Sequence, residues 1–373
     1  MEFPKISIII LNWNNVNDTI KCLESVYELD YPNYNVVLLD NNSTDNSLNR
    51  IRKYCSDYNI KISEFTEEVD NKLKKEIFNA ENNSNNNLIL IKNKKNYGYT
   101  KGNNIGIKFA LNNLIPNYLL ILNNDTKVDK NLLKNMVLTS QKDEKIAILQ
   151  PKLLFYDDHK IINTTGNKMD IFGSTMARGF CEIDSGQFDN LRTTGFFYAS
   201  GACFMIKKKF ILEFNKDELF DSLLFAYHED VDLNFTARIL GFNIVYCPEA
   251  ICYHKQGGSP KNYYIKLYWI QRNKFRIIIK NYSFQYLIFI LPTSIFIDFL
   301  SALFSTLYRM KLEYIKIFLK SIIWNIKNIS NTIEKRKIIQ SKRKVSDKEI
   351  MQFMELKPLN FYIDIKYLLN KYI

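Results

Sequence analysis

Residues 118–129 read YLLILNNDTKVD, and this stretch decides the fold of the chain. An unbroken run of five apolar or aromatic residues ends at Asn123, Asn124 and Asp125. A run this short and this apolar predicts a buried strand of a parallel sheet. Ligands of open α/β sheets bind beyond the carboxyl ends of such strands. The polar triplet is therefore expected at an active site, although a strand followed by an ordinary Asn/Asp turn has the same pattern.

Two similar runs stand at the start of the chain. Residues 6–12 (ISIIILN) and 34–40 (YNVVLLD) predict strands, and each is followed by polar residues and then a segment with helical spacing. We expect Asn17 or Asp18 to cap the first helix and Ser43 or Thr44 the second. Alternating strands and helices predict an α/β fold with a mostly parallel sheet flanked by helices. Neither strand is followed by G-x-G-x-x-G or a Walker loop, which argues against a dinucleotide oxidoreductase.

The rest of the first 254 residues continues this alternation less regularly. Residues 56–87 are polar and Asn-rich and predict a surface insertion with one helix near 67–78, while residues 155–195 lack periodicity and predict loops. Gly98, Gly102 and Gly106 allow close backbone approach to a ligand or to a neighbouring strand. Further strands are predicted at 88–91, 146–149, 197–206, 244–246 and 250–253.

A second polar cluster lies at residues 227–233 (YHEDVDL), where a helix is predicted to begin near Glu229. Carboxylates at a helix N-terminus are favoured by the helix dipole, so this cluster is open to a purely structural interpretation. Three carboxylates within four residues are more than capping requires, however. His254 follows the last predicted strand, and a single histidine of this kind is more often structural than a ligand.

The charge of the chain is unevenly distributed. The net charge is +12, yet residues 1–254 carry 29 Lys/Arg against 32 Asp/Glu, whereas residues 255–345 carry 18 Lys/Arg against three acids. A basic block with interleaved aromatic residues suits nucleic acid or an anionic membrane. Because the same block is rich in apolar residues, it favours a membrane surface, and we expect no nucleic acid partner.

Residues 286–307 are long enough to cross a bilayer. Asp298, Pro292 and five Ser/Thr count against a stable span, so an interfacial or re-entrant helix is preferred to a true span. The six cysteines show no CxxC pair and no signal peptide is recognisable, so a cytoplasmic protein at the inner face of the cell membrane, peripheral or monotopic, is expected. The predicted organisation is a nucleotide-binding domain (1–258, with the insertion 56–87), a helical membrane-associated region (259–345) and a C-terminal tail (346–373).

Seven motifs in sequence resemble glycosyltransferase family 2, the inverting nucleotide-sugar transferases with the GT-A fold. They cover about residues 5–255, and among family members they look most like the rhamnosyltransferase-type branch that builds cell-surface polysaccharides. The motifs are SIIILNWNN, VVLLDNNSTD, NYGYTKGNNIG, LILNNDT, ASGACFMI, HEDVDLxxxxRxxG and YCPEAxxxH. The Q-x-x-R-W signature of the processive synthases is missing.

The resemblance implies a role for each motif. Asp230 matches the general base and Glu229 its neighbour, while Asp125 and His254 match ligands of Mg²⁺ or Mn²⁺. The first Asp of the family's Asp-x-Asp site is here Asn123, which removes one charge from the metal site. The implied nucleotide-binding residues are Asn12, Asp40, Asn42, Gly98, Asn104 and Asn123. The residues implied to contact the donor sugar or the acceptor are Ser200, Gly201, Asp232 and Arg238.

The residue types suit this chemistry on their own account. Inversion needs a base that takes the proton from an acceptor hydroxyl, and a positioned carboxylate supplies it. A divalent ion neutralises the charge of a leaving nucleoside diphosphate. The sequence therefore predicts transfer of a sugar from a UDP- or dTDP-sugar to a hydroxyl of a lipid-linked or cell-surface saccharide. A non-catalytic saccharide- or nucleotide-binding protein on the same scaffold is the alternative.

Overall fold

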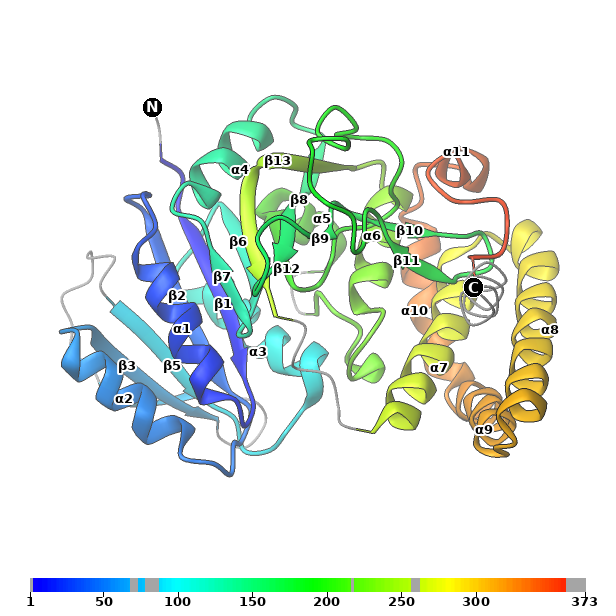
Figure 1. Ribbon diagram of the computed structural model, residues 1–373, viewed down its shortest axis with the longest axis horizontal. Helices are drawn as coiled ribbons and strands as arrows, with labels where there is room; N and C mark the ends of the chain where they lie inside the picture. Colours follow the sequence, from blue (N-terminus) through cyan, green and yellow to red (C-terminus); the bar gives the residue numbers. More distant parts are fainter. Residues whose placement is uncertain (1–2, 68–72, 78–86, 216–217, 256–261, 360–373) are drawn as a thin grey trace.

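The computed structural model describes residues 3–67, 73–77, 87–215, 218–255 and 262–359. Within these residues a large twisted sheet is covered by helices on both faces, and four long helices stand beside it at the right of Figure 1. The predicted α/β class is therefore confirmed. The sheet strands are β1 (Ile6–Asn12), β2 (Tyr34–Asp40), β3 (Lys61–Glu67), β4 (Leu73–Ile77), β5 (Asn87–Lys92), β6 (Tyr118–Asn123), β7 (Thr126–Val128), β8 (Ile146–Phe155), β9 (Ile162–Thr164), β12 (Cys203–Lys207) and β13 (Asn243–His254).

The order of the sheet is β4-β3-β5-β2-β1-β6-β12-β8-β13-β7. Its strands are parallel from β3 to β6, and β1 pairs with both β2 and β6, whereas the edge strand β4 pairs with β3 in the antiparallel sense. The register aligns Asn12 with Asp40 and Leu11 with Asn123, so the polar ends of three strands lie at one edge. The antiparallel strand β12 then separates β6 from the parallel pair β8 and β13. The active site is predicted from the sequence to lie at this edge of the sheet.

Two hydrophobic cores lie on opposite faces of the sheet because successive side chains of a strand alternate in direction. Ile8 and Ile10 belong to the core under α1, α2 and α4, whereas Ile9 belongs to the core under α3, α5 and α6. The helices that cover the sheet are α1 (Val16–Tyr27), α2 (Ser47–Asp57), α3 (Gly98–Asn113), α4 (Leu132–Ser140), α5 (Lys208–Phe214) and α6 (Glu229–Ile239).

Further elements pack beside α6. They are the β10–β11 hairpin (Asn167–Met169 and Thr175–Ala177), α7 (Tyr263–Asn281), α8 (Phe284–Arg309), α9 (Glu313–Lys327), α10 (Ile329–Ser341) and α11 (Asp347–Met351). Among the described residues α8 alone is long and apolar enough to cross a membrane. One side of α8 is nevertheless packed against protein: Ile290, Ser294, Asp298, Ala302 and Thr306 are buried at intervals of four residues.

The structure corrects the interpretation of residues 56–87. The described part of this segment extends the main sheet through β3 and β4, and no helix forms near 67–78 in the residues that can be described. The polar composition is misleading because Glu64 on β3 has charged partners: Arg52 and Lys92 both lie within ion-pair distance of it. A strand can carry such residues when ion pairs compensate their burial.

Other boundaries also differ from the predicted ones. Of the strand expected at 197–206, only Cys203 onward is extended, because side chains bind the preceding backbone: the N–H groups of Ala199 and Ser200 donate to Asn234 and Gln150. The two strands expected at 244–253 form one strand, β13, with a register shift. Neither α1 nor α2 has a side-chain cap.

Candidate active site

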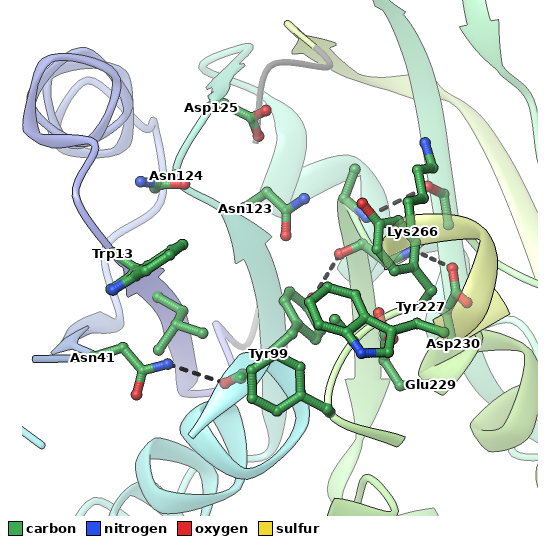
Figure 2. Close-up of a pocket in the computed structure, with 18 of the residues that line it drawn as sticks. Trp13, Asn41, Tyr99, Asn123, Asn124, Asp125, Tyr227, Glu229, Asp230 and Lys266 are labelled. Carbon is green, nitrogen blue, oxygen red and sulfur yellow. Dashed lines mark hydrogen bonds between the residues drawn. The ribbon is translucent and has the colours of Figure 1, made fainter. Parts of the chain in front are cut away.

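The polar edge of the sheet borders a cavity of about 670 Å³. Asn123, Asn124 and Asp125 lie on one side of this cavity, and Glu229 and Asp230 lie on the other (Figure 2). We call it the active-site cavity. Its other lining residues are Leu11, Trp13, Asn15, Asn41, Asn96, Gly98, Tyr99, Phe180, Ser200, Gly201, Ala202, Phe225, Ala226, Tyr227, His254, Lys266 and Trp269.

The polar triplet after β6 is held by neighbouring loops. The Asn124 amide donates to the Thr19 hydroxyl at 2.9 Å, which ties the end of β6 to α1. Asp125 is 5% exposed, and its Oδ1 lies 3.5 Å from Nε2 of His254 on β13. The other ring nitrogen of His254 lies 3.2 Å from Oδ1 of Asn163, which fixes the orientation of the ring.

The Asp125–His254 pair fits a divalent cation in chemistry and spacing. Two ligands at about 2.1 Å from one octahedral cation and at right angles to each other lie about 3.0 Å apart, close to the observed separation. Within the described residues no group of three His, Cys, Asp or Glu side chains has the geometry of a metal site. The protein therefore offers two ligands, and Mg²⁺ commonly takes the remainder from water and substrate phosphates.

The ends of β1 and β2 support the cavity wall from behind. Asn12 donates to Asp40 Oδ1 at 2.8 Å, and the N–H of Ser43 donates to the second oxygen of Asp40. Asn12 and Asp40 are buried and do not line the cavity, and the exposed Asn42 is also absent from its lining. The neighbouring residues Trp13 and Asn41 line it instead.

Gly98 lies where α3 meets the loop before α6. Its φ is +73°, and a Cβ atom there would stand 2.5 Å from the backbone oxygen of Phe225. The Asn41 side chain donates to the Gly98 carbonyl at 3.1 Å. Asn104, on the same helix, does not line the cavity: it exchanges hydrogen bonds with the backbone of Phe220. Gly98 and Asn104 thus fix the loop that leads to the acidic cluster.

Two adjacent carboxylates at the start of α6 face the cavity. Glu229 is 7% exposed, and its Oε2 has no hydrogen-bond partner among the described residues. Asp230 accepts hydrogen bonds from the N–H groups of Gly201 and Val231, both at 2.8 Å. Burial raises the pKa of Asp230, and burial followed by the charge of Asp230 raises the pKa of Glu229.

Gly201 brings β12 close to these two acids. A Cβ atom at this position would lie 3.3 Å from both Asp230 Oδ2 and Glu229 Oε1, so a larger residue would crowd the carboxylates. The Tyr99 hydroxyl donates to the Gly201 carbonyl at 2.8 Å. Ser200 lies beside Gly201 in the cavity wall. The backbone of this segment thus positions Asp230 through the Gly201 N–H.

A strained loop places the acids. Phe225, Tyr227 and His228 all have positive φ, between 64° and 67°, which costs energy for residues other than glycine. The buried amide of Asn273 on α7 donates to three carbonyl groups of this loop: those of Leu224, Ala226 and Tyr227, at 2.7–3.0 Å. One side chain thus offsets much of the strain.

Comparison with known proteins now identifies the family. The family model for glycosyltransferase like family 2 matches residues 4–274, well over half of the chain. The chain belongs to this family. Its match contains every residue that lines the active-site cavity.

A curated relative and solved structures agree with this glycosyltransferase assignment. The low-salt glycan biosynthesis hexosyltransferase Agl10 of Haloferax volcanii is 26% identical over 161 residues, which are 43% of this chain and half the length of that relative. S. aureus TarS 1-349 in complex with UDP-GlcNAc has a TM-score of 0.54 at 15% identity, covering 93% of this chain and 89% of that one. GalNAc-T7 with UDP, GalNAc and Mn²⁺ has a TM-score of 0.56 at 16% identity, covering 88% of this chain and 58% of that one.

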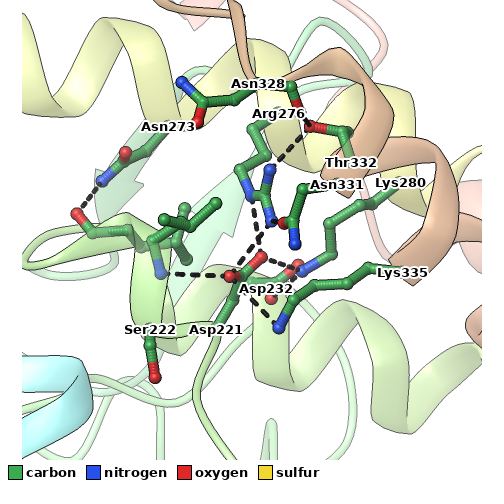
Figure 3. A network of polar contacts seen from close by, with 12 residues as sticks. Asp221, Ser222, Asp232, Asn273, Arg276, Lys280, Asn328, Asn331, Thr332 and Lys335 are labelled. Carbon is green, nitrogen blue, oxygen red and sulfur yellow. Dashed lines mark hydrogen bonds and ion pairs between the residues drawn. The ribbon is translucent and has the colours of Figure 1, made fainter.

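Two residues expected to contact sugar or acceptor lie away from the active-site cavity. Asp232 accepts hydrogen bonds from Lys280 and Asn281, and its neighbours form the ionic network of Figure 3. Arg238 donates to the backbone carbonyls of Phe196 and Phe197 and does not pair with Asp232. Neither residue is among those that line the active-site cavity.

The aromatic residues of the cavity were missed in the sequence. Trp13 and Tyr99 lie within motifs that were recognised, but Lys266 and Trp269 come from α7, beyond the last motif. The side chain of Trp269 packs against Phe225, with ring centroids 5.0 Å apart. Helix α7, which belongs to the basic region, thus forms one wall of the active-site cavity. The predicted domain boundary at residue 258 therefore divides the residues that line this one cavity.

Proposed function

We propose that this family member transfers a sugar from a UDP- or dTDP-sugar to a hydroxyl group of a saccharide acceptor, with inversion at the sugar carbon. The observation that carries the proposal is that Asp125 and Asp230 line one cavity although they lie on separate elements. One acid is placed beside a histidine that suits a metal–diphosphate group. The other stands where an incoming hydroxyl would meet a base.

Asp230 serves as the general base in this proposal. Burial raises the pKa of Asp230 above that of an ordinary carboxyl group. The ionised carboxylate is therefore a stronger base than an ordinary one. The two backbone N–H donors fix the orientation of the carboxylate. Glu229, whose pKa is raised as well, is suited to donate a hydrogen bond to substrate in its protonated form.

Asp125 and His254 are proposed to hold Mg²⁺ or Mn²⁺, and Asn123 to donate its amide to the donor diphosphate. When bound, such an ion neutralises the negative charge that develops on the leaving diphosphate. The remaining contacts to the nucleotide-sugar donor are assigned to Trp13 and Asn41 at the ends of β1 and β2. The structures of GalNAc-T7 and TarS, which hold UDP and UDP-GlcNAc, support a nucleotide-sugar as the donor class.

The test uses a panel of nucleotide sugars. The chain is incubated with Mn²⁺ and UDP-hexoses, UDP-N-acetylhexosamines or dTDP-rhamnose, and release of UDP or dTDP is measured with and without saccharide acceptors. At least one donor is expected to be turned over; dTDP-rhamnose tests the rhamnosyltransferase-like branch. Absence of turnover with all donors, together with no stabilisation by UDP or dTDP, would refute the proposal. If turnover were unchanged in excess EDTA, the proposal that Asp125 and His254 hold a metal ion needed for the reaction would be wrong.

We also propose that α8 and α9 rest on the inner face of the cell membrane and bring the site to a lipid-linked acceptor. The outer side of α8 exposes large apolar residues, with Phe289 71% and Phe296 60% exposed. Lys311, Lys316 and Lys320 lie in the following segment and suit anionic lipid head groups. Because the other side of α8 packs against α7 and α9, lipid cannot surround this helix, which favours an interfacial position over a span.

Vesicle flotation tests this orientation. The chain is expected to float with vesicles of phosphatidylglycerol and phosphatidylcholine, and the double variant Phe289→Asp/Phe296→Asp is expected to stay in solution. Tyr58→Asp is the matched control, since this exposed aromatic residue lies beyond α2 on the sheet domain. Equal flotation of the double variant and the wild type would contradict the proposed surface.

A further inference from the structure

A second cavity, of about 320 Å³, lies beside the active-site cavity. It is enclosed by the β10–β11 hairpin, the residue before α6, and one face each of α7 and α8. None of its lining residues belongs to the lining of the active-site cavity. We call it the α7–α8 cavity.

The wall between the two cavities is thin. Tyr227 and Glu229 line the active-site cavity, whereas His228, the residue between them, lines the α7–α8 cavity. Helix α7 is shared in the same way, with Trp269 facing the first cavity and Gln271 the second. A group bound in the α7–α8 cavity would therefore lie directly behind the residues that place Glu229 and Asp230.

The α7–α8 cavity contains two buried polar atoms without hydrogen-bond partners among the described residues. They are Nδ1 of His228, a residue 9% exposed, and Oδ2 of Asp298, a residue 4% exposed. The other nitrogen of His228 lies 3.5 Å from the Thr175 hydroxyl, and the other oxygen of Asp298 accepts from Lys274 at 2.6 Å. An unpaired buried polar group is costly, and a ligand that forms a hydrogen bond with it would remove this cost.

The buried part of the cavity is polar but electrically balanced. Lys274 and Asp298 neutralise each other, and burial lowers the pKa of His228 to about 3, so its ring is uncharged at neutral pH. The remaining charge of the lining is that of Arg309, an exposed residue at the end of α8. Ser301 and Ser305 add hydroxyl groups from α8. A wall that mixes neutral donors and acceptors suits a ligand with many hydroxyl groups better than an anion.

Asp298 is unusual for its position. It lies in the middle of α8, a helix of otherwise apolar character, and a buried ion pair of this kind adds little net stability compared with apolar packing. A buried carboxylate oxygen that has no described partner, on a residue that lines a cavity, contributes nothing to packing. It is the expected arrangement where a carboxylate receives a ligand hydroxyl. Tyr314 contributes an aromatic side chain to the same wall, which suits an apolar face of a sugar ring.

We propose that the α7–α8 cavity binds a sugar unit of the acceptor saccharide, at a distance from the hydroxyl that reacts. The inference rests on the proposed function, because it assigns this cavity to the acceptor of that same reaction. Asp298 and His228 accept or donate hydrogen bonds to its hydroxyls, and Ser301 and Ser305 complete the set from α8.

The test measures binding directly by saturation-transfer NMR. The probes are the methyl glycosides of glucose, galactose, mannose, rhamnose, N-acetylglucosamine and N-acetylgalactosamine, with UDP or dTDP and the diamagnetic ion Mg²⁺ present. Wild-type protein is expected to give a saturable signal with at least one glycoside. Ser301→Trp fills the cavity and is expected to abolish that signal, and Ser305→Ala, which deletes one hydroxyl, is expected to weaken binding several-fold.

Phe304→Trp, on the exposed side of α8, is the matched control and should bind like the wild type. Thermal unfolding of Ser301→Trp shows whether it is folded; if it is not, Ser305→Ala decides, and unchanged binding by Ser305→Ala overturns the proposal. A wild-type protein that binds none of the six glycosides, or a folded Ser301→Trp that binds them fully, also overturns it. Nucleotide release from donors is measured separately, so failure of this inference is distinguished from failure of the transferase function.

Discussion

Two acidic pairs lie close together around helix α6, and they differ in their partners. Glu229 and Asp230 face the active-site cavity, and neither forms an ion pair with a described cation. Asp221 and Asp232 lie on the side of the C-terminal helices, where Lys280 bridges them at 2.8 and 2.6 Å and Arg276 binds Asp221 (Figure 3). Asp221, Glu229 and Asp232 are buried, and Asp230 is half-buried.

The difference in partners separates a reactive pair from a structural pair. Burial raises the pKa of Glu229 and of Asp230 because no cation opposes it. Burial acts on Asp221 as well, yet the charges of Lys280, Arg276 and Lys335 outweigh it and hold its pKa well below the usual range. Perturbed carboxylates in a cavity indicate chemistry, whereas neutralised ones hold helices together. Variants of the two pairs should therefore fail in different ways.

The largest expected effect is on turnover. Asp230→Asn keeps the shape of the side chain but removes the base, so the rate of transfer should fall by about 10²–10⁴-fold. Measured kcat with a donor and acceptor pair checks this, and stabilisation by UDP or dTDP should persist. Asp57→Asn, an exposed acid at the end of α2, should match the wild type. If Asp230→Asn turned over substrate as fast as the wild type, Glu229 and Asp230 would not be the reactive pair.

Asp221→Asn should act on stability instead. Removing this carboxylate leaves Arg276 and Lys280 buried with one partner fewer, and breaking such a buried pair costs about 3–5 kcal/mol. Denaturant unfolding measures the loss, with Asp57→Asn again as the control. The fraction that remains folded should retain its turnover. A stable but inactive Asp221→Asn would instead place this acid in the chemistry.

The sequence predicted the strands that end at the site, because their runs of Ile, Leu and Val leave no other interpretation. Asp125 and Asp230 were also expected to meet, and they line the same cavity. In both cases the signal is local: an apolar strand, or a helix start, next to acids in excess of what capping needs. Patterns of this kind depend only on neighbouring residues, so they can be recognised before the fold is known.

Contacts that depend on distant residues were not predictable. Asp232 belongs to the same motif as Asp230, but it follows two residues later, about half a turn of α6. It therefore faces Lys280, a residue in a helix that the motifs do not reach. The wall formed by Trp269 was missed for the same reason. The strand β3 was not recognised because of its charged residues, since only the folded chain shows that Arg52 and Lys92 neutralise Glu64.

Asn273 links the two regions, because it holds the strained loop between Asp221 and Glu229. Asn273→Ala removes three hydrogen bonds to that loop, and a displacement of about 1 Å in an acid can cost about 10²-fold in rate. We expect kcat to fall by about 10–100-fold while the KM for the donor changes little. Asn113→Ala, at the exposed end of α3, is the control. A rise in KM with unchanged kcat would show that the loop serves binding and not the placement of the base.

The prediction for Glu229→Gln concerns how the stability of the protein depends on pH. Because the folded-state pKa of Glu229 is raised above its unfolded value, the folded state binds more protons between the two values, and the free energy of unfolding falls as pH rises through this window. Glutamine has no such dependence. The variant should therefore become more stable than the wild type as pH rises from about 5 to about 9, by about 1.4 kcal/mol for each unit of pKa difference.

Asp221→Asn is expected to change the stability of the protein with pH in the opposite direction. The folded-state pKa of Asp221 is depressed, so its contribution is present above the unfolded pKa and is lost as pH falls below it. The destabilisation caused by Asp221→Asn should therefore shrink in acid, whereas the stabilisation caused by Glu229→Gln should grow in alkali. Denaturant unfolding at several pH values measures both trends. If both variants changed stability with pH in the same direction, the cations around Asp221 would not account for the difference between the two pairs.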